Sequence, residues 1–158
     1  MNITVRKEVI TCRKCKHKVE FLYISDFSYG ERLALYDNGK KYAYINLLKD
    51  EIYNQFVEEI EIILQEKKEN IGKEKEQEIV DMTFKIACDK INGSEVDFIC
   101  NRKCEHCESE EVEDLLVEPE QIVCIDMPEI THNNWNTLSG EERRQTIINF
   151  FKLNKILY

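Results

Sequence analysis

The chain has no long apolar run, since no stretch of its 158 residues approaches the about 18 consecutive apolar residues of a membrane-spanning helix. Its first residues reach Arg6 and Lys7 at once and lack the apolar core of a signal peptide. It also has no low-complexity linker, and no internal repeat except two cysteine pairs. These absences predict one cytoplasmic domain without a membrane partner, long enough to bury a substantial core.

Positive charge is scarce in the middle of the chain. This segment alone is more negative than the whole chain, whose net charge is −9. Residues 1–50 carry 10 Lys and Arg against 6 Asp and Glu, whereas residues 51–120 carry 8 against 21. Such an acidic segment repels a phosphate backbone and suits a basic protein surface. The simpler interpretation is a solvated acidic helix face. Charge therefore favours a basic protein partner over nucleic acid.

Cysteine is the residue type that indicates a chemistry. Seven cysteines cannot pair completely, and reducing conditions in the cytoplasm keep them as thiols or metal ligands. Four of them form two Cys-x-x-Cys pairs with 88 residues between, namely Cys12 with Cys15 and Cys104 with Cys107. A two-residue gap lets both sulfurs of a turn face one ion, and four thiolates suit tetrahedral zinc. The sequence therefore predicts one structural zinc ion bound by these four residues.

Three other residues lie near the pairs and leave the ligand set open. His17, Cys100 or His106 can replace one of the four thiolates in a site with mixed ligands, although the spacing favours the all-cysteine set. Cys100 is otherwise expected to be a buried strand residue. Cys88 and Cys124 fall in apolar patterns and are interpreted as small core residues.

The first cysteine turn, from Cys12 through His17 to Phe21, resembles the leading knuckle of bacterial zinc-ribbon proteins, and most nearly the small CpXC-type ribbons. Arg13 stands where those knuckles have proline. Lys16 and Glu108 stand at the glycine positions of the two turns. The resemblance covers about residues 9–24 and 98–117. It implies a metal-stapled fold and no particular activity.

Apolar periodicity predicts the elements around these turns. Short strands are expected at residues 19–24, 33–36, 42–45, 96–100, 112–117 and 122–125. The second and third flank Asp37, Asn38 and Gly39, which favour a tight hairpin turn. Helical spacing predicts two helices of roughly twenty residues within about 47–92, the first stopped by a left-handed Gly72. Ser139 and Glu142 form a capping box that begins a last helix.

These elements predict an α+β fold: a small antiparallel zinc-ribbon-like sheet with an inserted antiparallel helical hairpin and a C-terminal helix. We expect a single domain over residues 1–158. Its split zinc ribbon comprises 1–46 and 94–127, the hairpin about 47–92, and the C-terminal helix about 139–154. The metal then closes a long loop, which in theory removes much chain entropy.

No catalytic constellation emerges from the sequence. Four thiolates around zinc leave no position for water, so a zinc hydrolase requires a site with three protein ligands. His132 lies in a polar loop, where Trp135 is interpreted as an anchor before the last helix. We therefore expect a non-enzymatic protein-interaction module (adaptor, inhibitor or immunity-type protein) that presents its acidic helices to a basic partner. The alternative is a nucleic-acid-associated regulator using the basic first knuckle.

Overall fold

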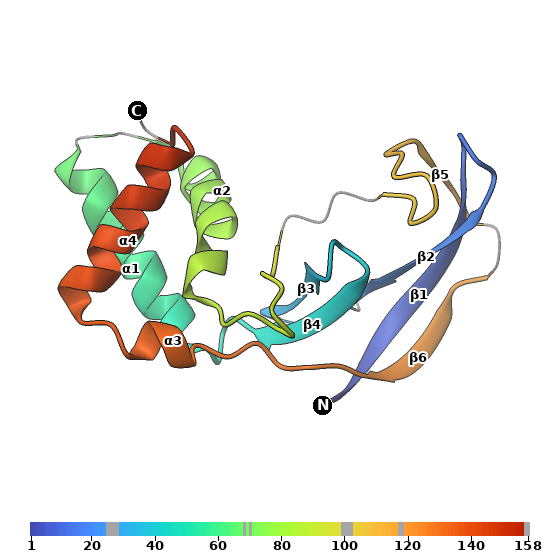
Figure 1. The fold of residues 1–158 in the computed structure, drawn as a ribbon, viewed down its shortest axis with the longest axis horizontal. Helices are drawn as coiled ribbons and strands as arrows, with labels where there is room; N and C mark the ends of the chain where they lie inside the picture. The colour runs from blue at the N-terminus through green and yellow to red at the C-terminus, as the bar shows by residue number, and fades with distance from the viewer. Residues whose placement is uncertain (25–28, 68, 70, 99–102, 117–118, 157–158) are drawn as a thin grey trace.

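The computed structural model describes residues 1–24, 29–67, 69, 71–98, 103–116 and 119–156, and it confirms the α+β class. Figure 1 shows three layers side by side along the long axis of the molecule. A four-stranded antiparallel sheet forms one end, a two-stranded hairpin lies in the middle, and the helices form the other end. None of the helices within these ranges is long and apolar enough to cross a membrane.

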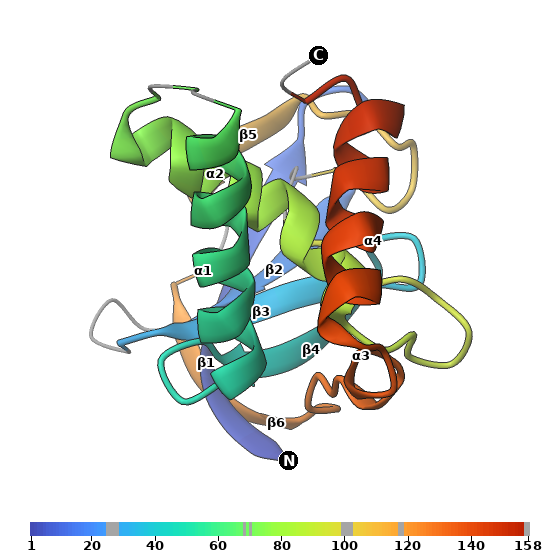
Figure 2. The ribbon, with the colours of Figure 1, turned by 90° about the vertical axis from the view of Figure 1, so that its left-hand side faces the viewer.

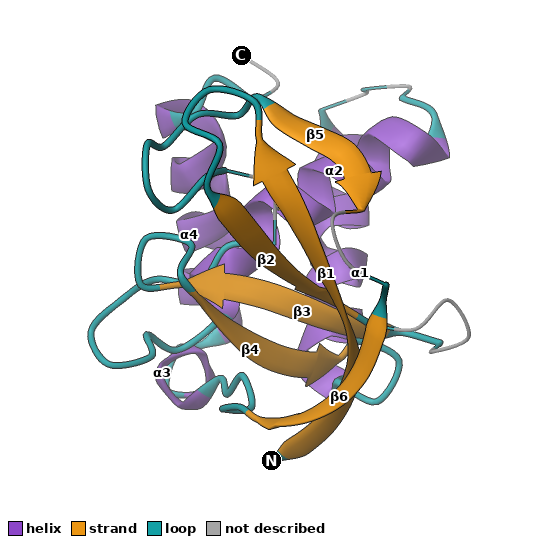
Figure 3. Cartoon of the chain, turned by 90° about the vertical axis from the view of Figure 1, so that its right-hand side faces the viewer, coloured by secondary structure: helices purple, strands orange, loops and turns teal. Residues whose placement is uncertain are grey.

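The four-stranded sheet is organised around β1 (Asn2–Cys12), which pairs along both of its edges. On one edge β2 (Lys18–Tyr23) runs antiparallel to it. On the other edge β6 (Gln121–Asp126) pairs with residues 2–7, and β5 (Val112–Leu116) pairs near the end of β1 (Figure 3). This central strand was not among the predicted strands.

The predicted hairpin is present as β3 (Glu31–Tyr36) and β4 (Lys41–Asn46), but it forms a sheet of its own. Asp37, Asn38 and Gly39 occupy the turn with φ of 53°, 57° and 80°, the left-handed values expected from their sequence. The strand alternation sends Ala34 into the helical core, whereas Tyr44 contributes to a second cluster with residues of β1. The hairpin is therefore the middle layer between helices and sheet.

The helical end consists of α1 (Glu51–Glu66), α2 (Lys73–Thr83), a 3₁₀ turn (Phe84–Ala87), α3 (Asn133–Asn136) and α4 (Gly140–Leu153). Figure 2 shows α1 and α4 in front of the β3–β4 hairpin, with α2 between them. The helices share one apolar cluster with this hairpin, and Phe56, Phe84, Ile147 and Phe151 are among its buried members. The predicted capping box of α4 is confirmed.

The second helix differs from the prediction at both ends. Gly72 has φ of −68° and precedes α2 as its N-cap, so it is not a left-handed stop for α1. The α-helix ends at Thr83, well before residue 92, because the chain tightens into the 3₁₀ turn that buries Phe84 and Ala87. The backbone N–H of Asp89 then donates to Thr131 O at 2.8 Å and ties this exit to the loop before α3.

Two further expectations are corrected. The predicted strand at 96–100 is reduced to a single bridge between Leu35 and Asp97, and residues 99–102, including Cys100, lie outside the described residues. Cys124 is exposed on β6 and is not a core residue, whereas Cys88 is half-buried against the helical cluster. The division into a split ribbon and an inserted hairpin stays a prediction.

Candidate metal centre

The structure brings together the four cysteines predicted to bind metal. The Sγ of Cys12 lies 3.6 Å from that of Cys107, and the Sγ of Cys15 lies 3.5 Å from that of Cys104. All four sulfurs lie within 4.8 Å of one another, and all four residues are free thiols. Four sulfurs bound to one ion at about 2.3 Å in a tetrahedron lie about 3.8 Å apart. The cluster can therefore hold one tetrahedral ion of the zinc type.

The two cysteine turns have the same backbone geometry. In the first, the N–H of Lys16 donates to Cys12 O at 2.9 Å, and that of Cys12 donates to His17 O at 2.9 Å. In the second, the N–H of Glu108 donates to Cys104 O at 2.8 Å. Lys16 and Glu108 adopt φ of 64° and 57°, the left-handed conformation that glycine enters without strain. The ribbon-type turn therefore forms here without its glycine.

Strand pairing brings the turns together although they are distant in sequence. Cys12 is the last residue of β1 and pairs with Val112, the first residue of β5, a few residues after the second turn. The N–H of Arg13 extends this register by donating to Glu111 O at 2.9 Å. The first turn thus connects β1 to β2, and the second turn leads into the strand beside it.

The electrostatics of the cluster call for a cation. The backbone N–H of Cys15 points at the Cys12 sulfur and lowers the pKa of Cys12 to about 6, against the opposing effect of burial. The backbone N–H of His17 also favours the Cys15 thiolate, but burial and the neighbouring sulfurs prevail and raise the pKa of Cys15 to about 12. The turns thus favour ionisation of one thiol, that of Cys12. Ionisation of all four thiols together requires a divalent ion between the sulfurs.

His17 and His106 lie at the rim of the cluster, each in one of the two turns. Their rings are stacked with centroids 3.7 Å apart and an interplanar angle of 12°. A ring nitrogen of each lies within 4.8 Å of the Cys15 sulfur. Both residues were predicted only as replacements for a thiolate. Their stacking was missed, and no sequence pattern indicates it, because His17 follows its cysteine pair whereas His106 lies inside its own.

Comparison with known proteins adds no relative. No family model, no curated protein and no solved structure matches this chain. The likeness to zinc ribbons is therefore carried by the two cysteine turns and by the clustering of their sulfurs.

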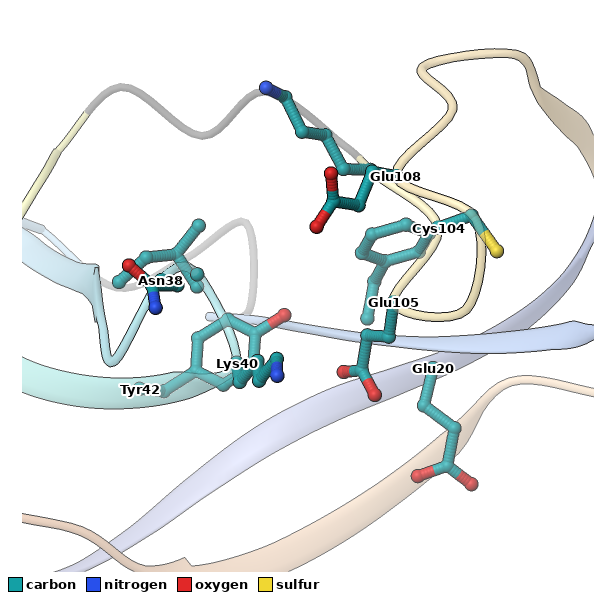
Figure 4. A pocket seen from close by; sticks show the side chains of 11 residues that line it. Glu20, Asn38, Lys40, Tyr42, Cys104, Glu105 and Glu108 are labelled. Atoms are coloured by element: carbon teal, nitrogen blue, oxygen red, sulfur yellow. The ribbon is translucent and has the colours of Figure 1, made fainter.

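A hollow of about 480 Å³ lies beside the second turn, between β2 and the β3–β4 turn (Figure 4). Glu105 and Glu20 line it from the side of the cysteine turns, and Lys40 and Tyr42 line it from the hairpin. The Cys104 sulfur points away from it. Among the described residues, the hollow's lining includes no histidine, and its titratable side chains are three glutamates, two lysines, one tyrosine and Cys104.

His132 and Trp135 belong to the helical end, far along the molecule from the sulfurs. The Nδ1 of His132 lies 2.7 Å from Ala87 O, and its Nε2 lies 3.0 Å from a carboxylate oxygen of Asp50, the N-cap of α1. The buried Trp135 ring lies 5.7 Å from that of Phe56. The predicted anchor before the last helix is confirmed, and His132 joins three segments of this end.

Proposed function

We propose that this chain is a non-enzymatic zinc-ribbon protein in which Cys12, Cys15, Cys104 and Cys107 hold one structural zinc ion. Its acidic helices bind a basic protein partner, in the manner of an adaptor, an inhibitor or an immunity-type protein. A cytoplasmic setting is part of the proposal, because reducing conditions preserve the free thiols that the metal requires.

The closed ligand set supports a structural role for the metal. Four thiolates fill a tetrahedral site and leave no position for a water molecule or a substrate. The other histidine considered for catalysis, His132, has both ring nitrogens engaged by Ala87 and Asp50. Neither group is free to activate a nucleophile.

The observation that carries the proposal is the set of exposed carboxylates on α1 and α2. Glu58, Glu61 and Glu74 are exposed and form no ion pair within the described ranges. Glu59 and Glu66 differ, because both bind Arg144 of α4, the first at 2.6 Å. Solvated carboxylates of one sign attract a basic surface and accelerate its association. Glu58, Glu61 and Glu74 are therefore the residues that define the proposed acidic surface.

The test is a pull-down from native lysate with charge reversals at this surface. We expect the triple variant E58K/E61K/E74K to lose a basic partner that the unchanged chain retains, and raised salt to release that partner. The control reverses Glu95, Glu129 and Glu141, exposed residues outside the two helices, of which Glu95 pairs with Lys90 at 3.4 Å. Circular dichroism and zinc content verify folding. Identical partners on the triple variant and the control would contradict the proposal.

A second candidate is supported by the basic first turn, where Arg13, Lys14, Lys16 and Lys18 are exposed around His17. Nucleic-acid binding through this turn predicts an affinity that falls steeply with salt. Tyr23 does not offer a free ring face for stacking, because the Arg6 guanidinium lies 5.7 Å from its ring centroid and its hydroxyl lies between the carboxylates of Glu8 and Glu120. A filter-binding titration with RNA and DNA over a salt series distinguishes the two candidate functions. A chain that binds only a basic protein should bind neither nucleic acid, even at low salt.

A further inference from the structure

The stacked histidines form, with one cysteine, a second group of ligand atoms at the edge of the sulfur cluster. The Cys15 sulfur and one nitrogen each of His17 and His106 lie within 4.8 Å of one another. Both histidines are exposed, and Cys15 is half-exposed, whereas Cys12 and Cys104 are buried. The group therefore faces outward from the Cys15 corner of the cluster, which is half-exposed, as is the Cys107 corner.

The backbone positions this group as firmly as it positions the four sulfurs. The carbonyl of His17 accepts the N–H of Cys12, and His106 lies between Cys104 and Cys107 in the equivalent turn. Because β1–β5 pairing holds the two turns together, the His17 ring of the first turn stacks on the His106 ring of the second. The stack thus results from the same geometry that gathers the sulfurs.

The chemistry of this group suits a borderline transition metal. Imidazole and thiolate are the ligands that Zn²⁺, Co²⁺ and Ni²⁺ prefer in proteins, and three of them leave a position open. A hollow lined by His17, His106 and the carboxylate-bearing Glu105 adjoins the group and offers an oxygen ligand.

Charge favours a second ion beside the first. Four thiolates around one divalent ion leave a surplus of negative charge. A thiolate that already binds one ion retains lone pairs, so its sulfur can bridge to another. A second cation at Cys15 reduces the surplus charge where solvent can deliver the ion.

We propose that Cys15, His17 and His106 form a rim site for a second zinc-type ion, which shares the Cys15 thiolate with the ion of the four-cysteine centre. The inference rests on the proposed zinc centre, because the bridging thiolate belongs to both. It differs from the replacement of a thiolate by histidine within one centre, since that arrangement holds a single ion.

The test measures bound zinc in the full-length chain at increasing, chelator-buffered free Zn²⁺. We expect two equivalents for the unchanged chain and one for H17Q/H106Q. The matched control K14Q alters an exposed residue of the same turn and should keep two. With Co²⁺ in place of zinc, the second equivalent should shift the thiolate charge-transfer absorption, because it binds a sulfur already bound to the first.

Each other outcome has a definite meaning. One equivalent in the unchanged chain at every zinc concentration overturns the rim site and leaves the four-cysteine centre intact. A second equivalent that persists in H17Q/H106Q assigns it to adventitious ligands and also overturns the proposal. No tightly bound zinc in the unchanged chain overturns the four-cysteine centre itself, so the two failures are distinguishable.

Discussion

The sheet end and the helical end of this molecule are stabilised in different ways. At the helical end, side chains from four helices and the β3–β4 hairpin share one large apolar cluster. At the sheet end, two small buried clusters appear among the described residues: Ile10, Cys12, Val19, Phe21 and Cys104 under the two turns, and Ile3, Val5, Tyr44 and Met127 toward the hairpin. We therefore expect apolar burial, at about 25 cal/mol per Å², to sustain the first end and the proposed metal to stabilise the second. Removing the metal should therefore destabilise the sheet end and leave the helical end folded.

The largest effect is expected from Cys104→Ser, which removes one thiolate from the centre. Structural zinc contributes apparent binding energies of about 10–16 kcal/mol in small zinc domains, and this energy supports folding. We expect the variant to release its zinc and to lose hydrogen-exchange protection along β1, β2 and β5, while α1 and α4 stay protected. Hydrogen exchange followed by mass spectrometry, with elemental analysis, measures both effects.

Cys124→Ser is the matched control, because it changes an exposed thiol on the same sheet. It should keep both zinc and protection. If the helices of Cys104→Ser lose protection together with the strands, the two ends form one cooperative unit, and the difference drawn between them is wrong.

The converse change is Phe56→Ala at the helical end. Phe56 is 2% exposed and its ring lies 5.4 Å from that of Phe84. Removing a buried phenyl ring typically costs about 3–5 kcal/mol through lost burial and the cavity left behind. We expect urea unfolding, followed by circular dichroism at 222 nm, to show a loss of this size in the free energy of unfolding. The zinc content should stay unchanged. Zinc lost in proportion to the loss of helix would contradict independent ends.

Sequence patterns were sufficient where the signal is local. The hairpin turn at Asp37–Gly39, the capping box at Ser139 and the two cysteine turns each depend on a few adjacent residues, and each is present in the structure. The clustering of the four cysteines was predictable for the same reason, because a two-residue gap between thiolates is a short-range signature.

The patterns failed where tertiary packing decides. β1 alternates poorly, since Val9 and Ile10 are adjacent and both buried, yet pairing on two edges makes it the central strand. The end of α2 at Thr83 is followed by the 3₁₀ turn that buries Phe84 and by Asp89 contacts with the loop after β6, which no local pattern encodes. The separate sheet of β3 and β4 likewise follows from helices packing on one of its faces.

A smaller and pH-dependent effect is expected at Asp89, which links α2 to α3 without any metal. Partial burial opposes ionisation of its carboxyl, but the N–H groups of Asn134 and Asn133 and the hydroxyl of Thr131 donate to it and lower its pKa to about 2. Because the pKa in the folded chain lies below the ordinary aspartate value of 3.8, the stabilisation by the ionised carboxylate is present above pH 3.8 and is lost as pH falls toward 2.

We expect Asp89→Asn to lower stability by about 1 kcal/mol at neutral pH, after allowance for solvent screening of a partly exposed group. The difference between variant and unchanged chain should shrink as the pH approaches 2. Urea titrations of the metal-free proteins at several pH values measure this at the helical end alone. A difference that is constant with pH would assign the effect to packing and not to the ionised carboxylate.

The smallest effect concerns the two left-handed residues of the cysteine turns and sharpens the comparison at the sheet end. A left-handed conformation costs an L-residue about 1–2 kcal/mol. The greater freedom of glycine in the unfolded chain takes back about 0.4–1 kcal/mol. We therefore expect Lys16→Gly and Glu108→Gly each to stabilise the zinc-loaded chain by about 0.5 kcal/mol, as the difference of these two effects.

Gly39→Ala in the β3–β4 turn is the opposite change and the control. Gly39 has φ of 80°, and a Cβ there would meet no atom within 4 Å, so conformational strain alone should destabilise this variant. Zinc release is measured by chelator titration, and stability by urea unfolding. Relief of strain in a cysteine turn should raise zinc retention, whereas the change in the β3–β4 turn should leave zinc retention unaltered. Destabilisation by both glycine substitutions would mean that the Lys16 and Glu108 side chains contribute more to the turns than their backbone strain costs.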